Sequence, residues 1–138
     1  MATKMLSTKL FKRPSAYSPW SASAVVAAGD SLVFTTGLTA RDLHGAIVGP
    51  DDIDIQTRRV FELLGGILAE AGSSLQDVVS MTVFLKDIEA DVAAVQAIRN
   101  EIWPSDPPVS STTQVGRLVS EEIRIEIAAI AAIRSSPR

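Results

Sequence analysis

The last third of the chain contains two segments with the residue pattern of β-strands, and this feature constrains the fold more than any other. The first segment spans residues 107–118 and is rich in serine, threonine and valine. The second spans residues 123–131 and begins with isoleucine at every other position, from Ile123 to Ile127. Because a period of two is typical of a strand with one buried face, we expect two strands joined by a polar turn.

Two amphipathic helices are expected ahead of these strands. Asp52 or Asp54 can cap the start of the first helix, and Gly72 can supply a left-handed turn at its end. Its apolar residues recur at spacings of three and four and share one face: Val60, Leu63, Leu64, Ile67, Leu68 and Ala71. The second helix spans residues 87–103 and ends before Pro104. Its predicted inward residues are Val92, Val95, Ile98 and Ile102.

Two adjacent glycines, Gly65 and Gly66, lie in the middle of the first predicted helix. Each costs about 1 kcal/mol of helix stability relative to alanine. Either the helix approaches the sheet closely at this point, which would require small residues, or the pair is a tolerated local weakness. The sequence leaves both interpretations open.

Further strand patterns lie near the start of the chain. Residues 22–27 and 31–36 are both capable of forming strands, and Gly29 and Asp30 between them favour a tight turn. These two segments are therefore predicted to form a hairpin. A shorter strand is expected over residues 5–11.

Residues 78–85 form a predicted strand between the two helices, with apolar residues on both faces. The predicted faces are Val79, Met81, Val83 and Leu85 on one side and Val78, Ser80, Thr82 and Phe84 on the other. The alternation of strands and helices favours one α+β domain over residues 1–138, with both helices on a single face of one mixed sheet. Because the other face is also apolar, a second subunit is its natural cover.

Composition excludes several kinds of site. The 138 residues include no cysteine, so disulfides, thiolate metal sites and cysteine nucleophiles are excluded. The single histidine, His44, lies in a predicted loop, so no metal site is expected. A net charge of −3 argues against nucleic acid as a partner, and no apolar run is long enough to span a membrane. A cytoplasmic location is expected.

A set of short motifs, spread roughly over residues 17–133, matches a known pattern. The matching segments are Ser18-Pro19-Trp20-Ser21, residues 33–37, 56–58, 71–79 and 82–87, Pro108, Ser111, Gln114-Val115, Arg117-Leu118 and residues 125–127. Each motif is weak alone, but together they are specific. In these motifs the chain resembles the Rid family, also called the YjgF/YER057c/UK114 family.

The resemblance implies a chorismate-mutase-like fold and a homotrimer with a barrel-like core. It also implies that a small-molecule ligand binds in clefts between neighbouring subunits. The activity that it implies is the hydrolysis of reactive imines and enamines, such as 2-aminoacrylate, to a keto acid and ammonia. By the same resemblance, that reaction requires no metal or organic cofactor.

The chain departs from the family pattern at the position where an arginine is usual, in Pro-Pro-Ala-Arg-Ser. The residue here is Ser110, which cannot carry a positive charge or bind a carboxylate through two parallel hydrogen bonds. Trp20 replaces a tyrosine and Thr112 replaces a cysteine, whereas Gly37 and Glu126 are retained. We therefore expect the cleft to be present but 2-aminoacrylate to be hydrolysed poorly.

The resemblance makes Glu126 the candidate catalytic residue, which would orient water or act as a general acid and base. The candidate substrate-binding residues are Trp20, Gly37, Arg41, Ser110, Ser111 and Thr112. Arg41 either replaces the missing cation or is a solvated loop residue paired with Asp42. Glu126 and Trp20 also have structural interpretations, as an interface ion-pair partner and as a core aromatic residue.

Three functions remain open on the sequence alone. The first is hydrolytic deamination of an imine, enamine or related small metabolite between subunits. The second is a non-catalytic trimer that binds a small metabolite or serves regulation. The third, RNA cleavage or inhibition of translation, is disfavoured by the acidic net charge and the single histidine.

Overall fold

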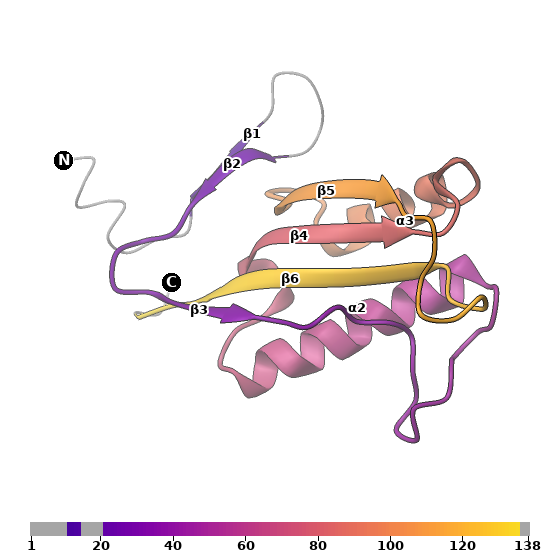
Figure 1. Cartoon of the computed structure of the whole chain (residues 1–138). Helices are drawn as coiled ribbons and strands as arrows, with labels where there is room; N and C mark the ends of the chain where they lie inside the picture. The colour runs from indigo at the N-terminus through magenta and orange to yellow at the C-terminus, as the bar shows by residue number, and fades with distance from the viewer. Residues whose placement is uncertain (1–10, 15–20, 136–138) are drawn as a thin grey trace.

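A computed structural model describes residues 11–14 and 21–135, with side chains from residue 24 onward (Figure 1). Its elements are β1 (Phe11–Pro14), β2 (Ser21–Val25), β3 (Ser31–Phe34), α2 (Ile53–Glu70), the 3-10 helix η1 (Leu75–Asp77), β4 (Val78–Leu85), α3 (Ile88–Ile102), β5 (Val109–Gln114) and β6 (Ile125–Ile133). The predicted order of strands and helices is confirmed. Residues 5–10 of the first predicted strand lie outside the described residues.

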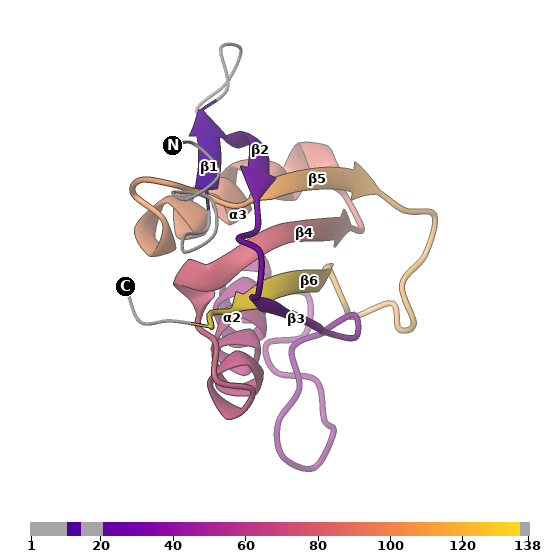
Figure 2. The same cartoon turned by 90° about the vertical axis from the view of Figure 1, so that its left-hand side faces the viewer.

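Four strands form one mixed sheet in the order β3-β6-β4-β5. β6 runs antiparallel to both β3 and β4, whereas β4 and β5 are parallel. Among the described residues, both long helices pack on the same face of this sheet (Figures 1 and 2). We call this the helix face and its opposite the open face. β1 and β2 form a separate antiparallel pair.

The core lies between the helix face and the two helices. Every second residue of β6 from Ile125 to Ala131 is buried, as its alternating sequence predicts. Buried apolar residues of the helices are Val60, Phe61, Leu64 and Leu68 on α2 and Val95 and Ile98 on α3. Trp103 packs edge-on against Phe61, with ring centroids 5.6 Å apart. Its indole N–H donates to the carbonyl of Leu75 at 3.0 Å, so the tryptophan also fixes the end of α3.

The caps of α2 agree with the prediction. Asp52 is the N-cap, and its side chain accepts a hydrogen bond from the backbone N–H of Ile55 at 3.0 Å. Gly72 follows the helix with a φ of 83°. The predicted apolar face is wrong at Ile67, which is 37% exposed. Phe61, which is buried, shifts the centre of the buried stripe away from Ile67.

Neither of the two glycines in α2 approaches the sheet. The nearest atom to a Cβ built on Gly65 would belong to Leu75, at 3.6 Å. A Cβ on Gly66 would have no neighbour within 4 Å among the described residues. The structure therefore supports the second interpretation, in which the pair is a tolerated local weakness.

A buried glutamine joins the start of α2 to the segment that leads into β6. The side-chain amide of Gln56 donates to the carbonyls of Gly49 and Glu122, at 2.9 and 2.7 Å. Its oxygen accepts from the backbone N–H of Arg124 at 2.8 Å. Because these three hydrogen bonds satisfy a fully buried amide, they fix the chain immediately before β6.

The predicted faces of residues 78–85 are correct from Met81 onward but wrong at the start. Val83 and Leu85 are buried together with Met81, yet the residue buried ahead of them is Val78 and not Val79. The pairing of β4 with β6 shifts register between Val78 and Ser80. This irregularity inserts one residue and inverts the alternation.

The predicted hairpin between residues 22–27 and 31–36 is wrong, although the tight turn is present. Gly29 has a φ of 91°, as such a turn requires. However, β2 pairs with β1, and β3 pairs with β6. The carboxylate of Asp30 accepts hydrogen bonds from the backbone N–H and hydroxyl of Ser135, at 2.9 and 3.2 Å. These bonds hold the turn against the end of β6.

The two C-terminal strands are confirmed, but they are not neighbours because β4 lies between them. Residues 115–124 connect them across the end of β4. The N–H of Val115 donates to the carbonyl of Leu85, and the N–H of Lys86 donates to that of Arg124, both at 3.0 Å. This crossing leaves β5 at the edge of the four-stranded sheet.

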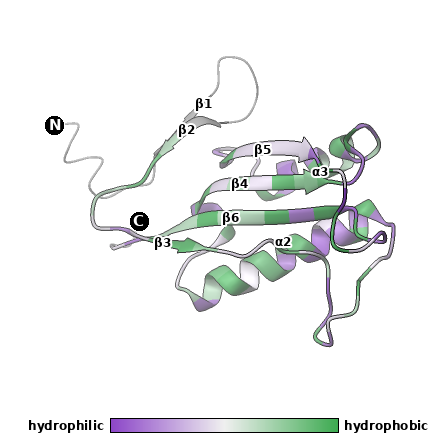
Figure 3. Ribbon diagram, viewed as in Figure 1, coloured by the Kyte–Doolittle hydropathy of each residue, from purple (hydrophilic) through white to green (hydrophobic). Residues whose placement is uncertain are grey.

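Apolar side chains remain exposed on the open face, where Figure 3 shows β3 and the adjoining part of β6 as hydrophobic. Phe34 is 68% exposed and Leu32 is 44% exposed. In the sheet register these residues lie opposite Ile130 and Ala132. The helices of the described chain include none with the length and apolar character needed to cross a membrane.

Candidate functional site

Two residues that the family pattern retains, Gly37 and Glu126, are in contact. Glu126 lies on the open face because Ile125 and Ile127 on either side of it are buried on the helix face. The backbones of Leu38 and Ile127 exchange two hydrogen bonds, at 2.8 and 3.0 Å, which hold residue 37 beside β6. A Cβ atom on Gly37 would lie 2.8 Å from Cδ of Glu126. A glycine is therefore needed for this carboxylate position.

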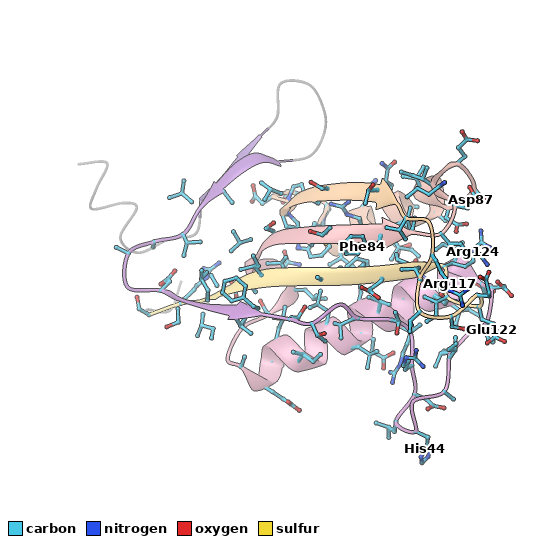
Figure 4. All side chains as sticks on the ribbon, in the orientation of Figure 1. His44, Phe84, Asp87, Arg117, Glu122 and Arg124 are labelled. Atoms are coloured by element: carbon cyan, nitrogen blue, oxygen red, sulfur yellow. The ribbon has the colours of Figure 1, made fainter. Side chains whose placement is uncertain are left out.

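The surroundings of Glu126 are defined by the sheet register. Glu126 lies opposite Phe84 of β4, which in turn lies opposite Thr113 of β5. Phe84 is partly buried on the sheet (Figure 4). Ser111 shares this face, two residues before Thr113, and is exposed. With the other described residues the carboxylate of Glu126 makes neither a hydrogen bond nor an ion pair, so it can act on a water or a ligand.

Ser110 and Thr112 lie on the opposite face from Glu126. In the register of β4 and β5, Ser110 is the partner of Met81, which is buried beneath the helices. Thr112 comes two residues later and shares that side. One chain thus places these hydroxyl groups on the helix face of β5 and the carboxylate on the open face of β6, with β4 between them. A site that uses both sets of groups requires a second copy of the chain.

A buried arginine contacts Ser110. Arg99 of α3 is 2% exposed, and its Nη2 donates to Oγ of Ser110 at 2.8 Å. Burial lowers the pKa of Arg99 to about 10, which leaves the guanidinium protonated at neutral pH. The sequence interpretation missed this residue. Its spacing was the available signal, because Arg99 is four residues after Val95 and three before Ile102, two residues predicted to point inward.

Arg41 is held within the loop that follows β3. Its Nε donates to Oγ1 of Thr39 at 3.1 Å, and its Nη1 donates to the carbonyl of Gly45 at 2.8 Å. The sequence also allowed Arg41 to be a solvated loop residue paired with Asp42. The side chain of Asp42 instead accepts hydrogen bonds from two backbone N–H groups of the same loop. His44 is exposed at the tip of that loop (Figure 4). A substrate-binding role for Arg41 stays a prediction.

Charged side chains also gather at one end of the molecule, where Figure 4 shows Arg117, Glu122 and Arg124. Nε of Arg124 donates to Oδ2 of Asp91 at 2.8 Å, and the Asp91 side chain is only 4% exposed. This hydrogen bond raises the pKa of Arg124. Arg117 forms an exposed ion pair with an N–O distance of 3.4 Å. We interpret these contacts as structural supports of the connection before β6.

The described part of the chain contains no candidate metal site. No three histidine, cysteine, aspartate or glutamate side chains are grouped there in a way that could hold a metal ion. Trp20 lies outside the described residues, so its role as a wall of the cleft also stays a prediction.

Comparison with known proteins identifies the family. The family model described as Endoribonuclease L-PSP matches residues 11–133. The chain is also similar to a solved structure from Yersinia pestis, described as the protein of unknown function YyfB of the conserved Rid family. The TM-score is 0.78 at 26% identity, over 91% of this chain and 98% of that one. The chain belongs to the Rid family.

Two curated relatives of this Rid chain are similar enough to inform its function. The 3-aminoacrylate deaminase RutC of Acinetobacter baylyi is 37% identical over 102 residues, which cover 74% of this chain and 79% of the relative. A RutC family protein of Pyrococcus abyssi is 34% identical over 131 residues, or 95% of this chain and 98% of the relative. The resemblance carried by the sequence motifs and the predicted α+β fold are thereby confirmed.

Members of the Rid family carry different functional descriptions. RutC is named as a deaminase, the family model is named for an endoribonuclease, and the Yersinia protein is described as having no known function. Membership alone therefore does not select one activity. The residues of the candidate site have to decide among them.

Proposed function

We propose that this Rid-family protein is a hydrolytic deaminase that acts on a small enamine or imine in a cleft between two subunits. The contact between Glu126 and Gly37 carries the proposal, because it places a carboxylate beside the exposed backbone of Gly37 on the open face of the sheet. The 37% identity with a protein named as a 3-aminoacrylate deaminase supports an enamine substrate. Such a substrate carries a carboxylate of its own.

Hydrolysis of an enamine requires a proton and a water in defined places. Protonation of the carbon next to the C–N carbon gives an iminium ion, and water then adds to the iminium carbon. Cleavage of the C–N bond releases ammonia and leaves a carbonyl compound. A carboxylate can take a proton from the attacking water and return it to the departing nitrogen. We assign this role to Glu126, and the reaction needs no cofactor.

Two features favour a closed assembly of several copies. The exposed Phe34 and Leu32 leave apolar surface on the open face, which a neighbouring subunit would bury. In addition, Glu126 and Ser110 lie on opposite faces of one chain, so one cleft can combine them only from two chains. We therefore propose a homotrimer in which each cleft takes Glu126 from one subunit and Ser110 and Thr112 from the next.

Ser110 limits the range of substrates. A hydrogen bond to a charged group contributes about 1.5–3 kcal/mol. A serine cannot replace the two parallel hydrogen bonds that an arginine makes with a carboxylate. In 2-aminoacrylate the carboxylate is attached to the carbon that bears nitrogen, whereas in 3-aminoacrylate it is one carbon further away. Because the relative RutC is named for the 3-isomer, we expect 3-aminoacrylate to be the better substrate.

Ammonia release tests the proposal directly. Enamines and imines, including the 2- and 3-isomers of aminoacrylate, are generated in place and mixed with the wild type or with Glu126→Gln. We expect the wild type to accelerate release and the variant to lose about 100-fold of the rate. Glu62→Gln, at an exposed glutamate on α2, is the control and should behave as wild type. If wild type and Glu126→Gln both leave the spontaneous rate unchanged for every compound, the deaminase is refuted.

A non-catalytic trimer that binds a small metabolite is the second candidate, and the absence of arginine at position 110 favours it. In that case a ligand would stabilise wild type and Glu126→Gln alike, by about 2.7 kcal/mol at 100 times its dissociation constant. Ammonia release would stay at the spontaneous rate. A screen of small carboxylates, amines and carbonyl compounds in which none raises the melting temperature would exclude this alternative.

A further inference from the structure

Ser110 and Arg99 form a charge-assisted pair on the helix face of the edge strand. Arg99 is almost completely buried on α3, whereas Ser110 is only partly buried on β5. The distance from Nη2 to Oγ is 2.8 Å. Burying a charged guanidinium costs free energy unless the charge is compensated. A role beyond packing would account for keeping Arg99 at this position.

The direction of this hydrogen bond constrains the serine hydroxyl. A guanidinium can only donate, so Oγ of Ser110 must be the acceptor. The hydroxyl hydrogen of Ser110 then has to be donated to something other than Arg99. A hydroxyl that accepts from a cation is also polarised and becomes a stronger donor. Because the serine is partly exposed, a ligand oxygen can take that hydrogen bond.

We propose that Arg99, acting through Ser110, supplies the positive electrostatic environment that selects a carboxylate-bearing ligand in the cleft. The cation would come from α3 and would reach the ligand through a hydroxyl group instead of a direct guanidinium fork. Arg99 is therefore a positioning residue and Ser110 the contacting one. The inference rests on the proposed function for the location of the cleft, but it concerns recognition and not the chemical step.

Acrylate and acrylamide are suitable probes, because they have nearly the same shape and differ in charge. Both are stable, and the chain has no cysteine that they could alkylate. Calorimetry or ligand-observed NMR would give the binding ratio of acrylate to acrylamide for the wild type, Ser110→Ala, Ser110→Thr, Arg99→Met and Arg99→Lys. We expect the wild type to prefer acrylate, and Ser110→Ala and Arg99→Met to lose about 10-fold or more of that preference.

The conservative variants separate recognition from folding. Ser110→Thr retains the hydroxyl and Arg99→Lys retains the charge, so both should keep most of the preference for acrylate. Ser74→Ala removes another serine hydroxyl that is bonded to a charged side chain, Asp77, and should leave the ratio unchanged. If Arg99 were purely structural, Arg99→Met would weaken the binding of both probes equally. If Arg99→Met does not fold, the binding ratio of Ser110→Ala still tests the inference.

The inference is overturned if the wild type binds the two probes equally, or if Ser110→Ala keeps the full preference for acrylate. A result that overturns this inference can be told apart from a result that refutes the deaminase activity. If the protein prefers acrylate through Ser110 but does not accelerate ammonia release from any enamine, the deaminase activity is refuted and the role of Arg99 is supported. If the protein accelerates ammonia release but binds acrylate and acrylamide equally, the deaminase activity is supported and the role of Arg99 is refuted.

Discussion

The carboxylate of Glu126 occupies the space that a side chain at residue 37 would need. A Cβ atom on Gly37 would lie 2.8 Å from Cδ and 3.2 Å from Cγ of Glu126. The clash involves the end of a flexible side chain, so an alanine could be accommodated if the carboxylate moved away. The glycine therefore determines where the carboxylate lies more than whether the chain folds.

Gly37→Ala should for that reason separate activity from stability. We expect the rate of ammonia release to fall by about 10- to 100-fold, because a displacement of about 1 Å at a reacting group has effects of this size. The free energy of unfolding should fall by no more than about 1 kcal/mol, since the glutamate can rotate. Steady-state kinetics and thermal melting on the same preparation would check both.

Gly66→Ala is the matched control for this change. A Cβ at this position has open space among the described residues, and alanine is favoured over glycine in a helix. We expect unchanged kinetics and a gain of about 1 kcal/mol in stability. A loss of stability in Gly66→Ala would indicate that another subunit packs against this part of α2.

Periodicity was sufficient to predict the elements that form locally. The caps of α2 and the alternation of β6 from Ile125 onward follow from residues adjacent in sequence. Pairing was harder to predict, because the partner of β3 is a distant part of the chain: Asp30 and Ser135, which flank the paired strands, are 105 residues apart. The inverted alternation at Val78 has the same origin, since a register shift is a property of two strands and not of one.

The prediction of the candidate site was incomplete for a similar reason. Motif resemblance named Gly37 and Glu126, and the fold brings them into contact. The same resemblance named Ser110, but only the sheet register shows that it faces the helices and meets Arg99. A charged residue in a helix is ordinarily assigned to solvent, so the burial of Arg99 could be inferred only from its spacing to Val95 and Ile102.

The ion pair between Asp91 and Arg124 should be important for stability. Removing only the cation, in Arg124→Met, leaves a carboxylate that is 4% exposed without its partner. We expect the free energy of unfolding to fall by about 3 kcal/mol. The double variant Asp91→Leu/Arg124→Met should recover most of that loss, because it removes both charges together. Urea denaturation at one fixed protomer concentration would measure this.

Arg117→Met is the control for that prediction, because its ion pair is exposed. Its effect should stay below about 1 kcal/mol. Equal losses in Arg117→Met and Arg124→Met would contradict the distinction between the two pairs.

The exposed pair between Arg58 and Glu101 joins α2 to α3 and predicts a dependence on pH. Two hydrogen bonds, of 2.8 and 3.2 Å, connect the side chains. The hydrogen bond from Arg58 lowers the pKa of Glu101. A carboxyl group with a lowered pKa in the folded state stabilises the protein above its unfolded pKa, and this contribution is lost as pH falls through the folded value.

The melting temperature of the wild type should therefore exceed that of Glu101→Gln at neutral pH, and the gap should close under acid conditions. High salt should narrow the gap at neutral pH as well, since both side chains are largely exposed. Thermal melts across pH and salt would test this. A gap that persists at a pH well below the lowered pKa of Glu101 would show that the substitution acts through something other than its charge.

The separation of Glu126 from Ser110 predicts that two defective chains can restore each other. Glu126→Gln lacks the proposed acid and base, and Ser110→Ala lacks the proposed contact with the carboxylate of the substrate. In a mixed trimer, one cleft can take Glu126 from the Ser110→Ala chain and Ser110 from the Glu126→Gln chain. That cleft has both native residues.

Unfolding the two variants together in equal amounts and refolding the mixture should recover about a quarter of wild-type activity, measured at low substrate concentration. The fraction follows because about three-quarters of the trimers are mixed, and each has one native cleft of three. The same variants refolded separately and then combined are the control, and they should show only the average of their own activities. If joint refolding gives no more than that average while the assembly remains trimeric, Glu126 and Ser110 do not share a cleft, and the proposed two-chain site is wrong.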